Sequence, residues 1–405
     1  MGQVVRNSTQ FETVIEADHR GQLLQSGPDS GTVDAFGRQR ISSPFPLFES
    51  TLRYDKAPDL WNETVSGSAS STHLPNESSV ALAVTASGGS VLRRTKRRLP
   101  YQPGKGLSVL QSYVGAPLVS GLVQEVGLFD DRNGILLRAS GTTMQFVIRS
   151  FTSGAVQEVV VDQENWNIFT FPTLDFSKAN IFTCDLEWLG VGRVKAGFVI
   201  DGEYQYCHEF NHANALNSVY MTTAILPLTY RIEATSAASG TMKQVCSSVS
   251  SEGGYEPLGP IYTISPSIVA IPNTSGERIV AGIRMMSGRT DNVIIPAKID
   301  LATEDTTTIQ WRLRKNATTS GVTWAAADNG RGNVQTTSSG SVVSGGTVID
   351  SGLFSAAGSV ELPLGAGLAS SLGVNVDGSS EELVLTVTSS GNAKATGLLG
   401  WREVL

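Results

Sequence analysis

Short runs of alternating polar and apolar residues, separated by turn-forming residues, are the feature that most restricts how this chain can fold. Alternation with a period of two places every second side chain on one face of a β-strand, whereas a helix repeats its apolar positions about every 3.6 residues. Turn signals recur throughout, with 42 glycines among 405 residues. This pattern is typical of antiparallel sandwiches and barrels, so it predicts an all-β protein. The clearest runs lie at 126–140, 142–161, 277–286, 306–315 and 382–404.

Changes in composition divide the chain into four predicted parts. Residues 1–48 carry glycine and proline signals that interrupt regular elements, so we expect an extended N-terminal arm. Residues 49–235 hold enough strands for a large antiparallel β-sandwich of the jelly-roll or concanavalin-lectin type. Residues 236–262 are small and polar and end in SEGGYEPLGP, which indicates a connector. Residues 263–405 predict a second, smaller β-sandwich domain, in which charges are sparse after Thr318.

Three phenylalanines in the predicted arm, Phe36, Phe45 and Phe48, have little local structure to bury them. An apolar side chain on an extended arm gains stability only when another surface covers it. We therefore expect these residues to lie against the following domain or a neighbouring subunit, and they are candidate interface residues.

The overall charge and the cysteine content exclude several classes of protein. A formal net charge of −7, with 17% charged residues, gives the chain no general affinity for nucleic acid. Three cysteines (Cys184, Cys207 and Cys246) are too few for a disulfide framework, which suits assembly in a reducing cytoplasm. We find no secretory-signal pattern and no apolar run long enough to span a membrane, so we expect no membrane insertion.

The sequence HEFNH (208–212) matches the zinc-peptidase signature, in which two histidines bind the metal and the glutamate acts as a base. That chemistry requires a helix, because only there do residues i and i+4 lie on one face. Here Asp201-Gly202 signals a two-residue hairpin turn, and residues 203–210 alternate as a strand. We therefore expect a strand histidine at His208 with Glu209 on the opposite face, no metal and no catalytic residues. The residues expected to share the face of His208 are Tyr204, Tyr206 and Phe210.

The strongest run of charge is Arg-Arg-Thr-Lys-Arg-Arg at 93–98. On an extended segment these cations point to both faces, and burying an unpaired charge on either face is costly. We therefore expect an edge, a rim or an intersubunit contact that pairs with acidic residues. Nucleic acid is the less favoured partner, because no aromatic residues interleave with the run. The candidate interface residues are Arg93, Arg94, Lys96, Arg97 and Arg98.

Two groups of carboxylates could carry other chemistry. The DDRNG sequence at 130–134 suggests calcium, but it lacks the remaining ligands of a calcium loop and fits a hairpin turn better. Asp185 and Glu187 share one face of a predicted strand, a spacing that could serve a glycosidase pair, although a solvated strand face is far commoner. Glu233, the distant carboxylate that a zinc site would need, lies in another predicted strand.

Six segments carry a family resemblance, and they read VDAFGRQRISSPFPLFESTLRYDKAPDLWNE, RLPYQPGKG, VGLFDDRNGI, DLEWLGVGRVKAGFVIDG, CHEFNHAN and VYMTTAILPLTYRIE. Together they resemble a widespread family of tailed-bacteriophage virion structural proteins, described as structural, tail or fibre-associated. The resemblance covers roughly residues 33–258 and implies no catalytic residues, cofactor or metal. Nothing after about residue 263 resembles the family, which suits proteins whose shared part attaches to the particle while the end varies.

The resemblance implies a non-enzymatic virion component, assembled in the bacterial cytoplasm, that docks through its arm and first sandwich and projects a C-terminal β domain. A tail or fibre position is the favoured interpretation, and a capsid-bound head fibre or decoration protein is the alternative. A glycan-binding or glycan-cleaving receptor-recognition protein, with a host surface glycan as partner, is a further alternative. The other expected partners are virion proteins and further copies of the chain, with a trimer favoured because particle components are symmetric.

Overall fold

The structure is a computed structural model in which the chain forms two compact units, Met1–Ser43 and Pro44–Leu405. The residues that it describes are 3–6, 12–17, 23–24, 43–264, 267–272, 276–303, 306–327, 332–354, 358–363 and 371–404.

The first unit contains a small antiparallel sheet within the predicted arm. β1 (Gln3–Arg6) pairs with β2 (Glu12–Ala17), and β2 pairs with β3 (Leu23–Leu24). The predicted end of the arm at residue 48 is wrong, because β4 (Phe45–Ser50) pairs with a strand of the second unit. Its backbone hydrogen bonds therefore make residues 45–50 part of a sheet.

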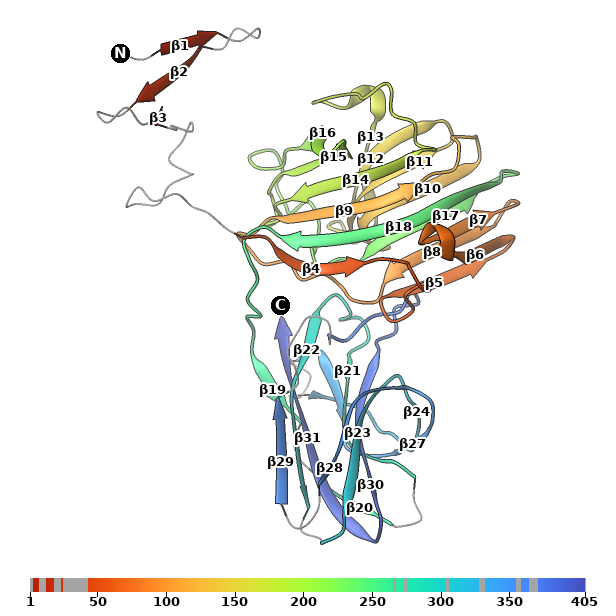
Figure 1. Cartoon of the computed structure of the whole chain (residues 1–405), viewed down its shortest axis with the longest axis vertical. Coiled ribbons are helices and arrows are strands. Elements are labelled where there is room, and N and C mark those ends of the chain that lie inside the picture. Colours follow the sequence, from red (N-terminus) through yellow and green to blue (C-terminus); the bar gives the residue numbers. More distant parts are fainter. Residues whose placement is uncertain are drawn as a thin grey trace. The chain divides into compact units, whose positions relative to one another are not determined.

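Residues 44–251 form an antiparallel β-sandwich, which confirms the predicted fold class for this part of the chain (Figure 1). The seven-stranded sheet has the order β13 (Gln157–Asp162), β12 (Thr143–Ser150), β11 (Gly134–Ser140), β10 (Leu122–Phe129), β17 (Leu228–Ala234), β8 (Ser90–Thr95) and β5 (Trp61–Ser66). The eight-stranded sheet has the order β16 (Glu203–Phe210), β15 (Val194–Ile200), β14 (Ala179–Leu186), β9 (Leu107–Val114), β18 (Gly240–Ser251), β7 (Ser79–Val84) and β6 (Ala69–Leu74), with β4 also on β18. Two short 3-10 helices, η1 (Pro75–Glu77) and η2 (Gln163–Asn165), lie in its connections.

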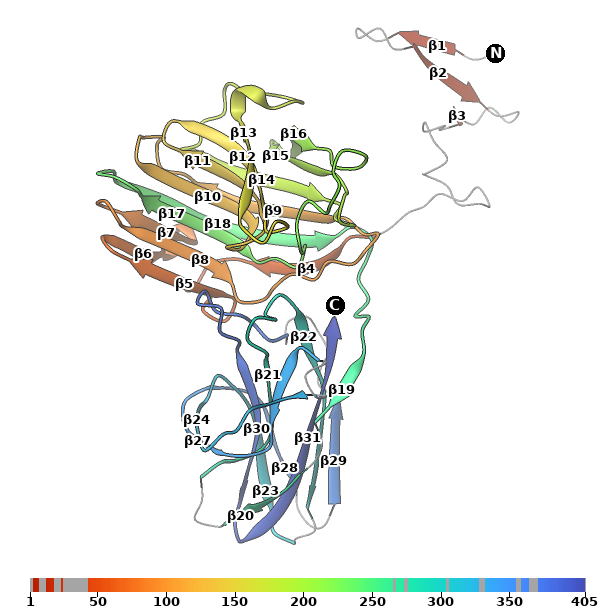
Figure 2. The same ribbon diagram turned by 180° about the vertical axis from the view of Figure 1, so that it is seen from behind.

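The predicted connector at 236–262 is wrong over most of its length, because β18 (Gly240–Ser251) is an interior strand of the eight-stranded sheet. It pairs with β9 along one side and with both β7 and β4 along the other (Figures 1 and 2). Its alternating burial was masked in the sequence by small polar residues, and Gln244, Ser247 and Ser251 are buried within the sheet. The link between the two sandwiches is the shorter segment 252–260.

The core of the first sandwich lies between its two sheets. Along β9 the side chains of Leu107, Val109 and Tyr113 are buried, and they alternate with partly exposed residues. Phe146 and Tyr230 reach the same core from the facing sheet. Because fully burying one large apolar side chain contributes about 1.5–3 kcal/mol, this alternation accounts for much of the stability of the sandwich.

Residues 261–404 contain the second, smaller sandwich (Figure 1). One sheet has the order β19 (Ile261–Thr263), β31 (Ala393–Val404), β22 (Val293–Thr303) and β29 (Gly358–Pro363), with β20 (Ser267–Ile271) also on β31. The other has the order β24 (Thr318–Ser320), β27 (Ser341–Ser344), β21 (Arg278–Met285), β30 (Glu382–Ser389), β23 (Ile309–Lys315) and β28 (Thr347–Phe354), with β26 (Val334–Thr337) on β21 and β25 (Ala325–Ala326) on β26. Trp311 and Trp401 are buried in the core between them.

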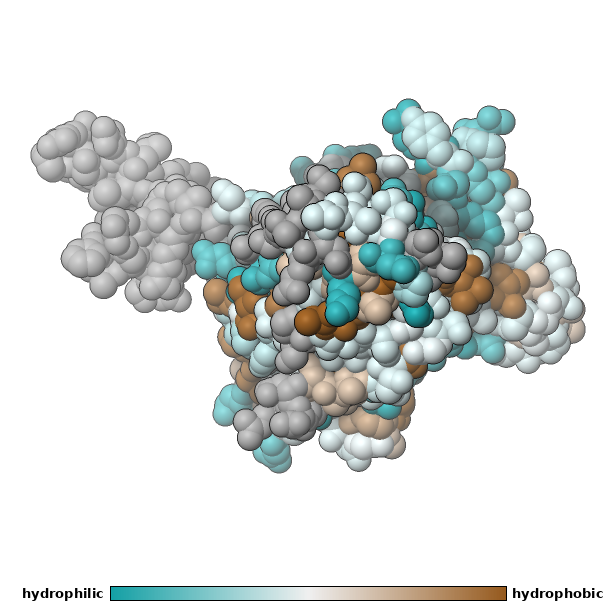
Figure 3. Space-filling view, turned by 90° about the horizontal axis from the view of Figure 1, so that it is seen from below, coloured by the Kyte–Doolittle hydropathy of each residue, from teal (hydrophilic) through white to brown (hydrophobic). Residues whose placement is uncertain are grey.

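The described surface is mainly weakly polar. Figure 3 views the protein from below and shows pale and teal residues over much of the coloured surface, with separate brown patches between them. In the second sandwich, the large apolar side chains that are more than half exposed are Ile261, Ile268, Val343 and Leu353. Among the described residues, no helix is long and apolar enough to cross a membrane.

Candidate functional site

The strand predicted across the HEFNH sequence is confirmed. β16 pairs with β15 after a two-residue turn at Asp201 and Gly202, whose φ values of 51° and 85° both lie in the left-handed region. The pairing shifts register between Ala196, which faces His208, and Gly197, which faces Tyr206. Cys207 is therefore an extra residue in the strand and forms a β-bulge.

The predicted set of residues that share the face of His208 is wrong, because the bulge separates Tyr204 and Tyr206 from it. One extra residue reverses the alternation beyond it, so Tyr204 and Tyr206 stay on the outer face. Cys207 and Phe210 both enter the hydrophobic core, and His208, between them, is buried as well.

The two histidines have separate partners. The Nδ1 of His208 accepts a hydrogen bond from the backbone N–H of Asn167 at 3.2 Å. The Nδ1 of His212 lies 2.6 Å from the carbonyl oxygen of Gly192, to which it donates, and its ring stacks on Tyr220 with the ring centroids 4.1 Å apart. The peptidase interpretation needs both imidazoles on one helix face, so this geometry does not support it.

Burial lowers the pKa of both His208 and His212, so each ring is neutral at neutral pH. The neighbouring carboxylate of Glu209 and the carbonyl of Gly192 oppose this effect without cancelling it. In the described part of the chain, no group of three or more histidine, cysteine, aspartate or glutamate side chains is placed to hold a metal ion.

The expectation that the basic run lies on a sheet edge is wrong, because β8 lies between β17 and β5. Arg93 is only 1% exposed and points into the sandwich. Its Nη1 lies 2.5 Å from Oε2 of Glu63, its Nε donates to Oε1 of Gln244 at 2.7 Å, and its Nη2 donates to the carbonyl of Lys56 at 2.7 Å. A core strand can carry this cation because each of the three guanidinium nitrogens of Arg93 donates a hydrogen bond. The acceptors are a carboxylate, a side-chain amide oxygen and a backbone carbonyl.

The other cations of the run also find partners within the chain. The ion pairs are Arg94 with Asp131 (2.8 Å), Arg98 with Asp130 (2.7 Å) and Lys96 with Glu381 (3.7 Å). Arg97 lies over the ring of Phe48, 5.5 Å from its centroid, and burial lowers its pKa although the charge of Glu381 opposes this. The pairing with acidic residues was predicted correctly, but the contacts join parts of one chain.

The three candidate phenylalanines have different surroundings. Phe48 is buried in the core of the first sandwich, with its ring edge-on to Trp61 at 5.9 Å. Phe45 is 40% exposed and stacks on Tyr255 with the centroids 5.6 Å apart. Phe36 lies outside the described residues. The expectation that such side chains lie against the following domain is therefore confirmed for Phe48.

The suggested calcium loop at 130–134 is a hairpin turn. Oδ1 of Asp130 accepts hydrogen bonds from the backbone N–H groups of Arg132 and Asn133, each at 2.8 Å. Burial raises the pKa of Asp130, but the charge of Arg98 and these hydrogen bonds outweigh it, so the pKa is lowered. With Asp131 held by Arg94, both carboxylates of the sequence already have cationic partners.

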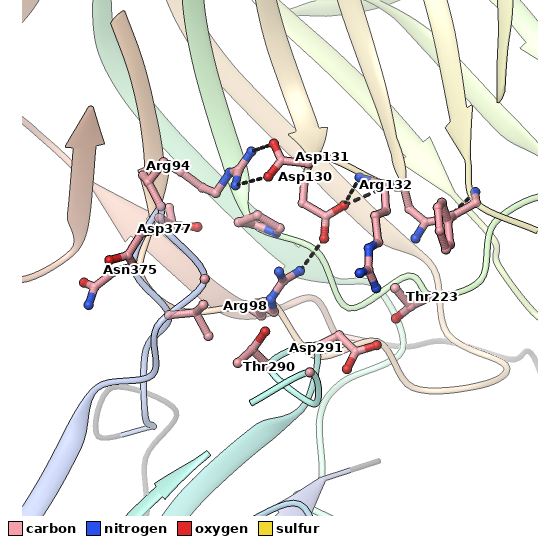
Figure 4. Close-up of a pocket in the computed structure, with 18 of the residues that line it drawn as sticks. Arg94, Arg98, Asp130, Asp131, Arg132, Thr223, Thr290, Asp291, Asn375 and Asp377 are labelled. Atoms are coloured by element: carbon pink, nitrogen blue, oxygen red, sulfur yellow. Dashed lines mark hydrogen bonds and ion pairs between the residues drawn. The ribbon is translucent and has the colours of Figure 1, made fainter. Parts of the chain in front are cut away.

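A cavity of about 250 Å³ lies where the two sandwiches meet, and we call it the junction cavity (Figure 4). Arg94, Arg98 and Asp130 line it from the first sandwich, and Asp291 and Asp377 line it from the second. On the first-sandwich side, Arg94 is paired with Asp131 and Arg98 with Asp130, so most of the charge there is already neutralised. We therefore assign these residues to the contact between the two sandwiches.

The junction is completed by a buried carboxylate, that of Glu381, which is 1% exposed. It lies 3.7 Å from Nζ of Lys96 in the first sandwich and 2.5 Å from Nζ of Lys315 in the second. Nearby, the backbone N–H of Val374 donates to the carbonyl of Lys96 at 2.6 Å, and that of Val376 donates to the Asn62 side chain at 2.8 Å. The basic run thus contributes directly to holding the sandwiches together.

A second cavity, of about 310 Å³, lies on the outer face of the eight-stranded sheet, and we call it the outer cleft. Asp185 and Glu187 both line it, as their predicted shared face requires. They alternate with Cys184 and Leu186, which enter the core. The other charged residues of the lining are Glu252, Lys105, Arg193 and Lys195. Three carboxylates and three cations therefore face one space.

Two tyrosines lie beside the outer cleft. The hydroxyl of Tyr206 donates a hydrogen bond to Oδ2 of Asp185, and Nζ of Lys195 lies 5.1 Å from the centre of the Tyr206 ring. Tyr204 stacks on Tyr206 with the centroids 6.0 Å apart, and it is 50% exposed. Within the described residues, the buried Oδ1 of Asp185 has no hydrogen-bond partner.

Glycine at 197 and the carboxylate of Glu252 complete the surroundings of the outer cleft. A Cβ on Gly197 would collide with the backbone of Gln205 and Tyr206, so only glycine lets the bulged strand approach β15 at this point. Burial raises the pKa of Glu252, and the negative charges of Asp185 and Glu187 raise it further.

A network of charges, which sequence reasoning missed, covers the outer face of the seven-stranded sheet. Glu125 is 1% exposed and lies 2.7 Å from Arg138, 3.1 Å from Arg231 and 3.6 Å from Arg149. Hydrogen bonds from Arg138 and then Arg149 lower the pKa of Glu158 to about 2 against the opposing effect of burial. These residues come from five different strands, so only the strand order reveals the network.

Glu252 and Glu381 were also missed. Glu252 falls in the segment predicted as a connector, and Glu381 lies in a part of the chain that was noted only for its few charges. The residues next to a single carboxylate do not show whether it will be buried in an ion pair or line a cleft, since its partners lie far away in the sequence.

No protein-family model matches the chain, and no curated protein is similar to it in sequence. Solved structures with similar arrangements include a β-glucanase from Bacillus licheniformis, at 12% identity over 52% of this chain and 99% of that one, with a TM-score of 0.34. A glycoside hydrolase family protein from Mycobacterium thermorestibile is 12% identical over 50% of this chain and 99% of that one, with a TM-score of 0.38. The CBM2 module of the evolved Dit of Lactobacillus casei BL23 phage J-1 is 6% identical over 54% of this chain and all of that one, with a TM-score of 0.34. At these scores and identities the similarities identify neither a close relative nor a function.

Proposed function

We propose that this chain is a non-enzymatic structural component of a tailed-phage particle, located on the tail or a fibre. The N-terminal arm and first sandwich attach it to other virion proteins, and the second sandwich projects. The family resemblance over residues 33–258 motivates this proposal.

The observation that carries the proposal is the joining of the two sandwiches into one body. A projecting domain keeps its direction only if it is held by more than a linker. Here Val293, Ile295 and Val404 of the second sandwich belong to the same buried cluster as the core of the first. The buried Lys96–Glu381 ion pair adds to this contact, as do the hydrogen bonds from the backbone N–H groups of Val374 and Val376.

Antibody labelling of intact particles tests the proposal. An antibody raised against residues 263–405 is expected to bind the tail or fibre in electron micrographs, and the signal should disappear after adsorption with purified protein. Labelling of the capsid would favour the head-fibre or decoration alternative. Absence of the chain from purified particles, measured by mass spectrometry, would contradict both.

We further propose that copies of the chain associate as a trimer through charge-poor surfaces of the second sandwich. The exposed apolar side chains Ile268, Val343 and Leu353 support this, since such residues are commonly covered in assemblies. Light scattering on the purified full chain measures the oligomeric state, and a monomer at micromolar concentration would contradict the trimer.

A further inference from the structure

We propose that the outer cleft binds an uncharged saccharide. This inference goes beyond the proposed virion role and does not depend on it. The cleft is a cavity of about 310 Å³ on the outer face of the eight-stranded sheet. Ligand pockets have volumes of about 300–1,000 Å³, so its size suits one or two sugar rings of a longer chain.

The charges of the outer cleft favour a ligand that is neutral and rich in hydroxyl groups. Asp185, Glu187 and Glu252 can accept hydrogen bonds, and Lys105, Arg193 and Lys195 can donate them. A sugar hydroxyl both donates and accepts, so it can bond to either kind of side chain. An anion or a cation would be attracted by one set of charges and repelled by the other.

Asp185 and Glu187 differ in how far a ligand can reach them. Tyr206 holds the Oδ2 of Asp185, which fixes the orientation of that carboxylate. Its Oδ1 is closed to solvent and has no hydrogen-bond partner among the described residues. The carboxylate that a ligand hydroxyl meets directly is therefore that of Glu187, which is exposed in the same lining.

The tyrosine pair supplies the apolar contact that a sugar ring needs. Pyranose rings present a face of C–H groups, and these pack well on an aromatic ring. Tyr204 is 50% exposed and is stacked on Tyr206, which in turn contacts Asp185 and Lys195. An aromatic surface thus continues directly from the charged lining of the cleft.

Binding of the full chain to immobilised neutral hexose and N-acetylhexosamine oligosaccharides tests the inference, with heparin as the anionic probe. We expect a neutral oligosaccharide to bind and heparin not to bind. Glu187→Gln and Tyr204→Ala should each weaken this binding by about ten-fold, the effect of losing one charge-assisted hydrogen bond or one stacking contact. The matched control is Tyr54→Ala, which removes a tyrosine that is 85% exposed and lies outside the cleft.

Three results would overturn the inference: binding of none of the neutral probes, binding of heparin alone, or binding that Tyr204→Ala leaves unchanged. Release of reducing ends from a bound probe would contradict the proposal that the protein is non-enzymatic. Both variants are expected to fold, because Glu187 is exposed and the Tyr204 side chain is half exposed. The result is separable from the virion proposal. If the chain binds a saccharide but is absent from particles, only the virion proposal is contradicted.

Discussion

Replacing Arg93 with methionine is expected to destabilise the first sandwich by about 3 kcal/mol. Removing one member of a buried ion pair costs about 3–5 kcal/mol, because the remaining partners stay buried without a counterpart. Methionine fills much of the arginine's volume but donates no hydrogen bond, so Gln244 and the Lys56 carbonyl lose their donors. The lower end of the range applies because 26% of the Glu63 side chain is exposed and it keeps its ion pair with Lys56 at 2.7 Å.

Urea unfolding followed by tryptophan fluorescence measures this loss, since Arg93 lies over the ring of Trp61 at 5.7 Å. The matched control is Lys243→Met, which breaks a pair with Glu77 whose side chains are 32% and 51% exposed. An exposed pair contributes about 0–1 kcal/mol, so the control should unfold almost as the parent does. If Arg93→Met were no more destabilising than Lys243→Met, the argument that Arg93 is held by buried partners would be refuted.

Three further predictions concern pH, the junction and metal binding. The pKa of Glu158, lowered to about 2 from 4.5, means that its contribution to stability is present above about pH 4.5 and is lost as the pH falls through about 2. Glu158→Gln should therefore flatten the change in melting temperature over this interval, and a curve identical to the parent's would contradict the charge network. Glu381→Gln removes the negative charge that pairs with Lys96, so the two sandwiches should unfold separately in this variant. Calorimetry is expected to show two transitions for the variant and one for the parent. A single transition in both proteins would argue against coupling of the sandwiches through this carboxylate. Because His208 and His212 have separate partners, added zinc should leave the melting temperature unchanged, and stoichiometric zinc in the purified protein would show this reading to be wrong.

Features encoded by neighbouring residues could be predicted from the sequence. The hairpin at Asp201-Gly202 and the strand through His208 follow from a turn signal and an alternating run, and both are found. The shared face of Asp185 and Glu187 follows from the same period of two. The bulge at Cys207 could not be predicted, because an extra residue leaves the local pattern unchanged until the pairing with β15 is known.

Features that depend on distant partners could not be predicted. A charged residue within a strand indicates exposure unless its counter-charge is known, and Gln244, one partner of Arg93, lies 151 residues further along the chain. For the same reason the sequence predicts a connector where β18 lies. Its small polar residues suggest a linker, and only the strands on both of its sides give them buried hydrogen-bond partners.

The pairing of β4 with β18 sets an order for biosynthesis. Phe45 pairs with Ser251, so about 200 residues beyond Phe45 must leave the ribosome before the eight-stranded sheet can close. Until then the earlier strands, including β7 and β9, lack their shared neighbour and leave apolar surfaces uncovered. The nascent polypeptide is consequently at risk of aggregation for most of its translation, and its yield in cells should depend on chaperones that shield those surfaces.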